Sequence, residues 1–538
     1  MARSLRNFPR FDTSGYVPPE NMIPIPVPFG SLVGMDKTSP LPAMDPGKYR
    51  LVRNLIIRYG AYETRPGTDL LGDQADNELL YACDVILPDG SKYVVRWKTN
   101  GVEVYDNSGW VNASGDSFAG LATAPFAITG WNDRVLFTAG VGKVFELTFS
   151  GGFVVTELDE SPEDVIHLTT FNGRVMASIK GTGIQWTVKN DHTDWTGLGS
   201  GYEDLLSAPG GRPDQQTAII PVTDEVAYCV RSSSIWQVGN TGDFDSPFSF
   251  TLIYTHVGTK YVGTVAATRR GLCCVGDNGQ VWFISPDVGA VDISSEVVPD
   301  FDVDPSYLEG MSASYDTKFD EYRVAIPTPN SLTAQKVLRY SFLNKGWTED
   351  VYPFPIKSIS YAQFTKSTTI DELVGTIDEL VGSIDNLGVV IRNPGCIYAT
   401  RGTSRLTIRD DVLMGSNTLR DVNFAGVRVA SGFRLESGDL KITSAIKNQE
   451  FVEMILWYQS DKEVTLDFDY SYDGGVTWNL VSQIDAPATG IRPKAISVNR
   501  TVEREHLQVA LSSTQAPAVK IIGASAMIRE AGRTVDAR

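Results

Sequence analysis

The sequence is poor in histidine and cysteine, and it has no long apolar run. None of the four histidines lies in an HExxH pattern or next to a CxxC pair, so a zinc site has no support. The five cysteines are an odd number scattered over 538 residues, which indicates buried thiols and not a disulfide framework. No apolar run reaches about 18 residues, so we expect no membrane span. The basic N-terminus is followed by the proline-broken MIPIPVPFG, which is not the apolar core of a secretory signal.

Motifs of enzyme chemistry are missing too. The chain contains no GxSxG elbow, no Walker A loop and no dinucleotide fingerprint. The adjacent Cys273 and Cys274 lie in an apolar stretch, which favours packing over nucleophilic chemistry. We therefore predict no catalytic residue, no cofactor and no metal ligand, and we expect a protein that is not an enzyme.

An excess of positive charge is also absent. The 65 Asp and Glu residues outnumber the 47 Lys and Arg residues and give a net charge of −18. This is the wrong sign for a protein that holds nucleic acid by neutralising phosphates. An acidic surface is nevertheless compatible with DNA that passes by without sticking, because like charges repel.

What the sequence does contain is a long repeat. Segments that begin at Ala82, Ala127, Leu168, Ala218, Ala266, Ser312 and Ser358 follow one another at intervals of 45, 41, 50, 48, 46 and 46 residues. Most of them have a short strand, a tight polar turn such as WNDR or FNGR, and a second apolar strand. Such a period predicts an all-β fold, a β-propeller of six or seven blades. A large β-sandwich is the alternative, although its turns would not recur at so constant a spacing.

Changes in composition divide the chain into three parts. Residues 1–50 are rich in Pro and Gly and are expected to form an extended arm. Residues 51–402 are assigned to the propeller, with the TIDELVG repeat at 369–388 as an insertion. Residues 403–538 alternate apolar and polar positions, which predicts an additional C-terminal β-sandwich or platform domain.

Two acidic stretches are the candidates for a loop or channel surface. EVVPDFDVD has carboxylates at calcium-loop spacing, but Pro305 replaces the required Gly and Met311 the bidentate Glu, so an EF-hand is rejected. TIDELVGTIDELVGSIDNLG has a heptad spacing, yet each of its glycines would cost about 1 kcal/mol in a helix, which favours three short turns over a coiled coil. The candidate channel or loop acids are Asp300, Asp302, Asp304, Asp371, Glu372, Asp378, Glu379 and Asp385.

Two further motifs each allow a structural and a sugar-binding interpretation. SYDGGVTW at 471–478 resembles the Asp-box of sialidases, in which Ser471, Asp473, Gly475 and Trp478 would form a structural hairpin turn. WTVKNDHTDWTG at 186–197 groups two tryptophans with Asp and His, which suits a capped turn or a surface for stacking on sugars. The turn is the favoured interpretation of both motifs.

Several stretches, in their order along the chain, resemble the tail nozzle proteins of short-tailed double-stranded DNA bacteriophages, also called tail tubular proteins B or packaged-DNA stabilisation proteins. LVRNLIIRYGAYETRPGTDLLG at 51–72 resembles the segment of that family that leads into a propeller through an Asn, a Gly turn and Arg-Pro-Gly-Thr. PVPFG and SPLPAMDPG resemble its Pro-rich arm. WTVKNDHTDWTG resembles an Asp-x-x-Asp-Trp neighbourhood of the family, and TIDELVG resembles a repeated tract late in its propeller.

The resemblance implies a structural protein of the virion tail, assembled in the host cytoplasm. It would form a homo-hexameric ring attached to the tail adaptor protein and to tail fibre or spike proteins, with a channel that retains and releases double-stranded DNA without reading its sequence. Two alternatives stay open. One is a propeller that binds glycans or hydrolyses them in the manner of a sialidase, because of the Asp-box. The other is a hub or receptor-contacting part of a phage tail.

Overall fold

The computed structural model describes most of the chain outside the N-terminal arm and the acidic repeat. The described residues are 22–27, 33–40, 43–45, 48–58, 61–106, 109–118, 120, 126–140, 142–181, 183–205, 214–302, 305–328, 333–367, 390–402, 405–410, 420–423, 425, 428–438, 440, 449–460, 464–471, 473–486, 492–502, 507–514 and 519–530. The TIDELVG tract at 369–388 lies outside them. Among the described residues, no helix is long and apolar enough to span a membrane.

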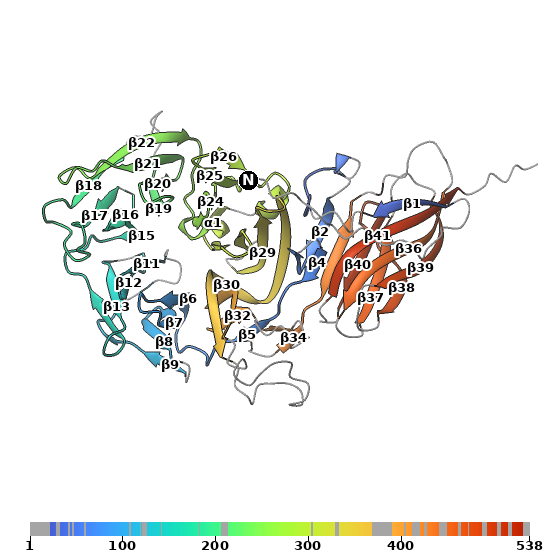
Figure 1. Ribbon diagram of the computed structural model, residues 1–538, viewed down its shortest axis with the longest axis horizontal. Coiled ribbons are helices and arrows are strands. Elements are labelled where there is room, and N and C mark those ends of the chain that lie inside the picture. The colour runs from blue at the N-terminus through green and yellow to red at the C-terminus, as the bar shows by residue number, and fades with distance from the viewer. Residues whose placement is uncertain are drawn as a thin grey trace, which may run out of the picture.

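Five consecutive sheets, each built on four antiparallel strands, form the first part of a ring (Figure 1). The first strand of each sheet lies nearest the centre and the last lies at the rim. In chain order the blades are β6 (Leu79–Ile86), β7 (Lys92–Lys98), β8 (Gly101–Tyr105) and β9 (Trp110–Asn112); β11 (Ala127–Trp131), β12 (Arg134–Thr138), β13 (Phe145–Thr148) and β14 (Val154–Glu157); β15 (Val165–Phe171), β16 (Arg174–Ile179), β17 (Ile184–Trp186) and β18 (Gly201–Glu203); β19 (Gln216–Pro221), β20 (Val226–Arg231), β21 (Ser234–Asn240) and β22 (Phe248–Thr255); and β23 (Ala266–Thr268), β24 (Gly271–Val275), β25 (Val281–Ser285) and β26 (Gly289–Asp292). The short β10 (Ser114–Gly115) adds to β14 in parallel.

Two more blades share one long strand. The sixth blade contains β27 (Ser312–Asp316), β28 (Glu321–Pro327), β29 (Ala334–Ser341) and the first half of β30 (Gly346–Ser367). The second half of β30 pairs with β31 (Val390–Thr400), which pairs with β32 (Thr407–Asp410). Strand β5 (Thr68–Leu70) then completes the seventh blade from the N-terminal side of the chain. The fold is therefore an all-β propeller of seven blades.

The seven segments found in the sequence all begin in the innermost strands: β6, β11, β15, β19, β23, β27 and the second half of β30. The hairpin turns explain why the repeat was visible. In FNGR, Phe171 pairs with Arg174, and Asn172 and Gly173 adopt φ of 49° and 68°, as a two-residue type I′ turn requires. The predicted propeller and its spacing are confirmed.

Apolar clusters fill the space between neighbouring blades. Trp97 and Phe137 belong to the cluster between the first two blades, and both are fully buried. Tyr228, Cys274 and Ile284 belong to a corresponding cluster between the fourth and fifth blades. All five cysteines are buried and free, as the sequence predicted.

The C-terminal unit is a two-layer β-sandwich. One layer contains β3 (Leu55–Arg58), β4 (Ala61–Thr64), β41 (Val519–Glu530), β36 (Gln449–Ser460) and β39 (Arg492–Val502), and β1 (Met22–Val27) also pairs with β41. The other contains β2 (Tyr49–Arg53), β35 (Phe433–Ser437), β40 (Gln508–Ser513), β37 (Val464–Ser471) and β38 (Asn479–Ala486). Phe451 and Phe468 meet edge to face between the layers, with ring centres 6.4 Å apart.

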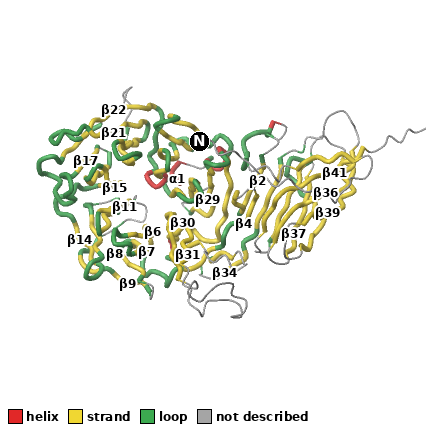
Figure 2. The backbone as a smooth tube through the Cα atoms, viewed as in Figure 1, coloured by secondary structure: helices red, strands yellow, loops and turns green. Residues whose placement is uncertain are grey.

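The remaining elements are short. Strands β33 (Arg420–Val422) and β34 (Arg428–Ala430) pair with each other. The helical elements named in the described part of the chain are η3 (Val262–Thr264), η4 (Val298–Phe301) and α1 (Pro305–Leu308). Figure 2 shows how little of the described chain is helical.

The strand pairings place the boundaries between the units differently from the sequence-based ranges. Residues 49–64, expected in the propeller or its arm, pair within the sandwich as β2, β3 and β4. Conversely, β32, expected in the C-terminal domain, belongs to the seventh blade. A short alternating strand shows which of its faces is buried but not which sheet it joins, because the partners are distant in sequence.

Replacing Trp97 with Ala should destabilise the propeller by about 3–5 kcal/mol, because the cavity would lie in a fully buried aromatic cluster. Urea unfolding of the full chain measures the change. Val111→Ala, on the outer strand of the same blade, is the control, since Val111 is 40% exposed and should change stability by less than about 0.5 kcal/mol. Equal effects of the two changes would contradict the assignment of the core.

Candidate functional site at the joint between propeller and sandwich

One strand physically joins the two units. Strand β2 pairs in parallel with β30 of the sixth blade through Arg53 and Glu349, and in antiparallel with β35 of the sandwich. The sheet of the sixth blade therefore runs on into one layer of the sandwich (Figure 1). A continuous sheet resists rotation between the units because a change in angle would break backbone hydrogen bonds.

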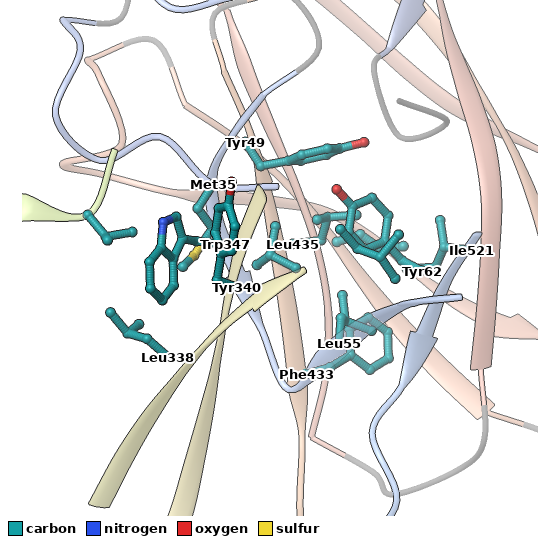
Figure 3. Packing of buried hydrophobic residues seen from close by; sticks show 14 of the residues in the cluster. Met35, Tyr49, Leu55, Tyr62, Leu338, Tyr340, Trp347, Phe433, Leu435 and Ile521 are labelled. Atoms are coloured by element: carbon teal, nitrogen blue, oxygen red, sulfur yellow. The ribbon is translucent and has the colours of Figure 1, made fainter. Parts of the chain in front are cut away.

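A single apolar core lies on this joint (Figure 3). The rings of Tyr49 and Tyr62, from the segment ahead of the propeller, meet edge to face 5.1 Å apart. In the sixth blade, Tyr340 and Trp347 lie 5.1 Å apart. Residues of the arm, the blade and the sandwich share this cluster: Met35, Leu55, Leu338, Phe433, Leu435 and Ile521.

Asn54 hydrogen-bonds to three parts of the chain. It follows β2 with φ of 55°, a left-handed conformation that Asn tolerates better than most residues. Its side-chain oxygen accepts hydrogen bonds from the backbone N–H of Val351, at 2.8 Å, and from Arg65 Nε, at 3.1 Å. Its side-chain nitrogen donates to the carbonyl of Gly432 at 2.6 Å. One side chain therefore ties together the sixth blade, the sandwich and the segment that precedes β5.

Arg65 is the buried cation at the centre of the joint, with 3% of its side chain exposed. Its two terminal nitrogens both donate to the carboxylate of Asp421, which is equally buried. Arg65 also donates to the carbonyl of Val351 at 3.1 Å, and its guanidinium lies 4.2 Å above the ring of Tyr352. Thr68 of the same Arg-Pro-Gly-Thr run donates to Asp421 at 3.2 Å.

Buried ion pairs extend from this centre through the sixth blade. Asp350 contacts Arg65 at 3.8 Å and Arg339 at 3.1 Å, and Arg339 also pairs with Glu321 at 3.2 Å. Arg323 completes the row by pairing with Glu321 and Asp316. Removing a single member would leave a charge buried without its partner, which is far more costly than the pair itself is stabilising.

The arm contributes a second row of ion pairs. Lys37 bridges Asp300, at 2.9 Å, and Glu349, at 2.5 Å. Lys336 pairs with Asp300 on its other side, at 2.6 Å, and Arg53 pairs with Glu349 at 2.7 Å. The arm is held against the sixth blade by its backbone as well, since the N–H of Met35 donates to the carbonyl of Trp347 at 2.8 Å.

The structure corrects the expectation for Asp300. Its side chain is 8% exposed and lies between Lys37 and Lys336, so it belongs to the joint and does not face a channel. Asp302 is exposed. Asp304, Asp371, Glu372, Asp378, Glu379 and Asp385 lie outside the described residues. Nothing in the spacing of the acids could have identified Lys37 as a partner, because 263 residues separate it from Asp300.

In the part of the chain that the structure describes, no group of three or more His, Cys, Asp or Glu side chains could hold a metal ion. The carboxylates of the joint are instead paired with Arg and Lys. This arrangement is suited to holding two units in one orientation.

The Asp-box residues form a hairpin turn between β37 and β38. Ser471 Oγ lies 2.8 Å from Asp473 Oδ1 and accepts a hydrogen bond from the backbone N–H of Gly475 at 3.0 Å. Hydrogen bonds from the hydroxyl and backbone of Thr477 lower the pKa of Asp473 to about 2. The guanidinium of Arg434 lies over the ring of Trp478, 5.0 Å from the ring centre. The carboxylate is therefore used to hold the turn.

The segment 186–197 fastens the third blade to the second. Trp186 and Trp195 are 7% and 2% exposed, so neither ring presents a face for stacking on a sugar. His192 Nε2 lies 2.8 Å from Glu146 of β13, and Arg134 also pairs with Glu146 at 3.1 Å. The hydrogen bond to His192, followed by the pair with Arg134, holds the pKa of Glu146 below its ordinary value.

Only the fold could be compared with known proteins, since no protein-family model and no curated protein matches the chain. Among solved structures it is similar to a streptogramin B lyase, at 14% identity over 64% of this chain and 97% of that one, with a TM-score of 0.39. It is also similar to the virginiamycin B lyase of Staphylococcus aureus, at 13% identity over 54% and 92%, with a TM-score of 0.36. The WD40 β-propeller domain of Doa1 matches at 11% identity over 64% and 96%, with a TM-score of 0.35. At such identities the likeness concerns the propeller fold and not activity.

Arg65→Ala should destabilise the chain by about 3–5 kcal/mol, because Asp421 would remain buried without its cation. Urea unfolding measures the loss. Arg53→Ala is the matched control, since the Arg53 side chain is 43% exposed and Glu349 keeps Lys37 as a partner. We expect the control to change stability by less than about 1 kcal/mol. If Arg65→Ala were as mild as the control, Arg65 would not be the centre of the joint.

Stability should fall in acid partly through Glu146. Its folded pKa lies below the ordinary 4.5, so the unfolded chain takes up the proton first as the pH drops. The stabilisation is therefore present above about pH 4.5 and is lost as the pH falls through the folded pKa. Thermal melts between pH 7 and pH 3 should show a smaller decline for Glu146→Gln than for the unmodified chain. Glu157→Gln is the control: its side chain is 38% exposed and its ion pair with Lys143 is 3.6 Å long, so the profile should change little.

Proposed function

We propose that this chain is a structural, non-enzymatic subunit of a short phage tail, the hexameric nozzle that retains and releases genomic double-stranded DNA. The observation that carries the proposal is the role of the segment that resembles the nozzle family. Its Asn and its Arg-Pro-Gly-Thr run are Asn54 and residues 65–68, and they form the buried joint between propeller and sandwich. The resemblance therefore falls on the residues that join the two units.

A rigid joint suits a conduit for DNA under pressure. The continuous sheet through β30, β2 and β35 and the rows of buried ion pairs oppose both bending and sliding between the units. A ring built from such subunits would transmit force without opening at the joint. Gating would then fall to loops at the channel and not to a hinge within each subunit.

The charge of the chain supports the same proposal. At −18 the subunit carries an excess of acid, and six copies would surround the channel with negative potential. DNA would slide along such a wall and would not be held by it. The proposed partners are further copies of this chain, the tail adaptor protein and the tail fibre or spike proteins.

No observation favours the glycan-directed alternative over the nozzle. The Asp473 carboxylate holds its own turn, and the tryptophans of the segment 186–197 are buried. A hub or receptor-contacting role in a tail would use the same rigid body and differs in the number of copies and in the partners.

Native mass measurement and negative-stain imaging of the purified full chain test the proposal. We expect rings of six copies with a central channel, and no retention of double-stranded DNA even at low salt, where a basic surface would bind it most strongly. Rings should persist when DNA is digested away. A monomer that binds or cleaves oligosaccharides would contradict the nozzle, and a ring with another number of copies would favour the hub or receptor-contacting role.

A further inference from the structure

The rim of the propeller carries one strand that differs from all the others. The outermost strands of the first, second, third, fifth and seventh blades are β9, β10, β18, β26 and β5, which have two to four residues each. The outer edge of the sixth blade is covered by β2. In the fourth blade, β22 has eight residues, and no strand of the described chain pairs with its outer edge.

The chemistry of β22 also sets it apart. Its sequence FSFTLIYT contains no charged residue and no proline. Ser249 and Thr251 are exposed, while Phe250, Leu252 and Tyr254 are half-buried. Proteins usually protect a long edge strand with lysine, proline, a bulge or a short length, because its free backbone groups can pair with another chain. Strand β22 has one bulge, at Ile253 near its end, so its regular edge runs from Phe248 to Leu252. This stretch contains no charge and no proline and is longer than the other outermost strands of the rim, which indicates a surface that is used for pairing.

Large apolar side chains lie exposed beside this edge. Phe244, in the loop that leads into β22, is 51% exposed, and Leu198 and Tyr202 at the edge of the third blade are 73% and 46% exposed. The two blades meet here, since a Cβ atom added to Gly199 would lie 3.2 Å from the carbonyl oxygen of Phe244. The edge and these side chains therefore form one surface, here called the rim surface: β22 with Leu198, Tyr202 and Phe244.

Among the described residues, the two layers of the sandwich end in β39 and β38. Strand β39 contains Arg492, Pro493 and Lys494, residues of the kinds that protect an edge, so β38 is the edge of the sandwich that resembles β22. Strand β38 of the sandwich also has eight residues, and it is the last strand of its sheet. Val476, in the turn before it, is 81% exposed, and Leu480 is 57% exposed. Figure 1 shows β22 along the upper rim of the propeller and β38 in the sandwich, with the sixth blade and β2 between them, so one copy cannot join its own two edges.

We propose that the rim surface of one copy binds β38 of the next copy by strand addition. The chain already contains such an addition, because β2 extends the sheet of the sixth blade through β30. Backbone hydrogen bonds would join the two sheets, and the exposed apolar residues of both edges would cover one another. Each copy uses two different edges, so the contact is heterologous and repeats into a ring, or into a filament if it does not close. The contact itself does not depend on the proposed function. Only the closure of the ring at six copies rests on it.

Lysines placed on the rim surface test the contact. Ser249→Lys combined with Thr251→Lys adds two charges at exposed positions of the edge, so the fold should survive while pairing is lost. At a concentration where the unmodified chain is fully assembled, the variant should sediment as a monomer with an unchanged melting temperature. Leu480→Lys should have the same effect from the other edge. Thr156→Lys, at an exposed position of β14, is the control that should still assemble.

Cysteine cross-linking distinguishes this contact from other modes of assembly. The native cysteines are all buried, so a bismaleimide should react only with introduced thiols. A mixture of Thr251→Cys and Leu480→Cys chains should give a cross-linked dimer, and each variant alone should give none. Cross-linking of Thr251→Cys alone would overturn the proposal in favour of an isologous contact.

The outcomes separate the two proposals. Rings of six that survive both lysine variants would overturn the rim contact and leave the nozzle standing. A filament that is linked through positions 251 and 480 would support the contact and contradict the six-fold nozzle. A chain that stays monomeric at every concentration would overturn both.

Discussion

The structure depends on one buried cation, Arg65. A guanidinium removed from water is costly unless every side of it is paired, and here both terminal nitrogens meet Asp421 while its face lies on Tyr352. Asp421 comes from the chain that follows the propeller, Tyr352 from the sixth blade, and Arg65 from the segment ahead of the first blade. The pairing is complete only when all three parts are in place, so the burial of Arg65 selects a single arrangement of the two units.

The pairing of the other charged residues at the joint follows from this arrangement of the two units. Once β2 lies beside β30, Arg53 and Glu349 become neighbours, and Glu349 adjoins Asp350 in the same strand. The two carboxylates then face different rows: Glu349 pairs with Lys37 of the arm, and Asp350 pairs with Arg339 of the blade. Acids and bases alternate through the joint because an unpaired charge there would be more costly than any ion pair is stabilising.

Local features of the structure could be predicted from the sequence, and distant pairings could not. A hairpin is encoded within about a dozen residues, so the blades and their spacing could be predicted from turns such as Asn172-Gly173. The sandwich could be predicted because apolar and polar residues alternate along its strands. The burial of Asp300 could not be predicted. In the sequence, an aspartate of an acidic loop cannot be told from one half of a buried ion pair, because only the fold brings Lys37 to Asp300. For the same reason β2, β3 and β4 were assigned to the wrong unit: their alternation is correct, but their partners lie hundreds of residues away.

The segment from Tyr49 to Leu70 explains why the two units are not independent. Its first three strands complete the sandwich, and β5 then completes the seventh blade by pairing with β32. Arg65 lies between β4 and β5, at the point where the chain passes from the sandwich to the propeller. A propeller without this segment lacks its closing strand, and a sandwich without it lacks strands in both layers. Because the pairings on both sides span most of the chain, they carry a large loop-closure cost and are expected to form late in folding. The joint that holds the two units in place is thus expected to be among the late contacts of folding.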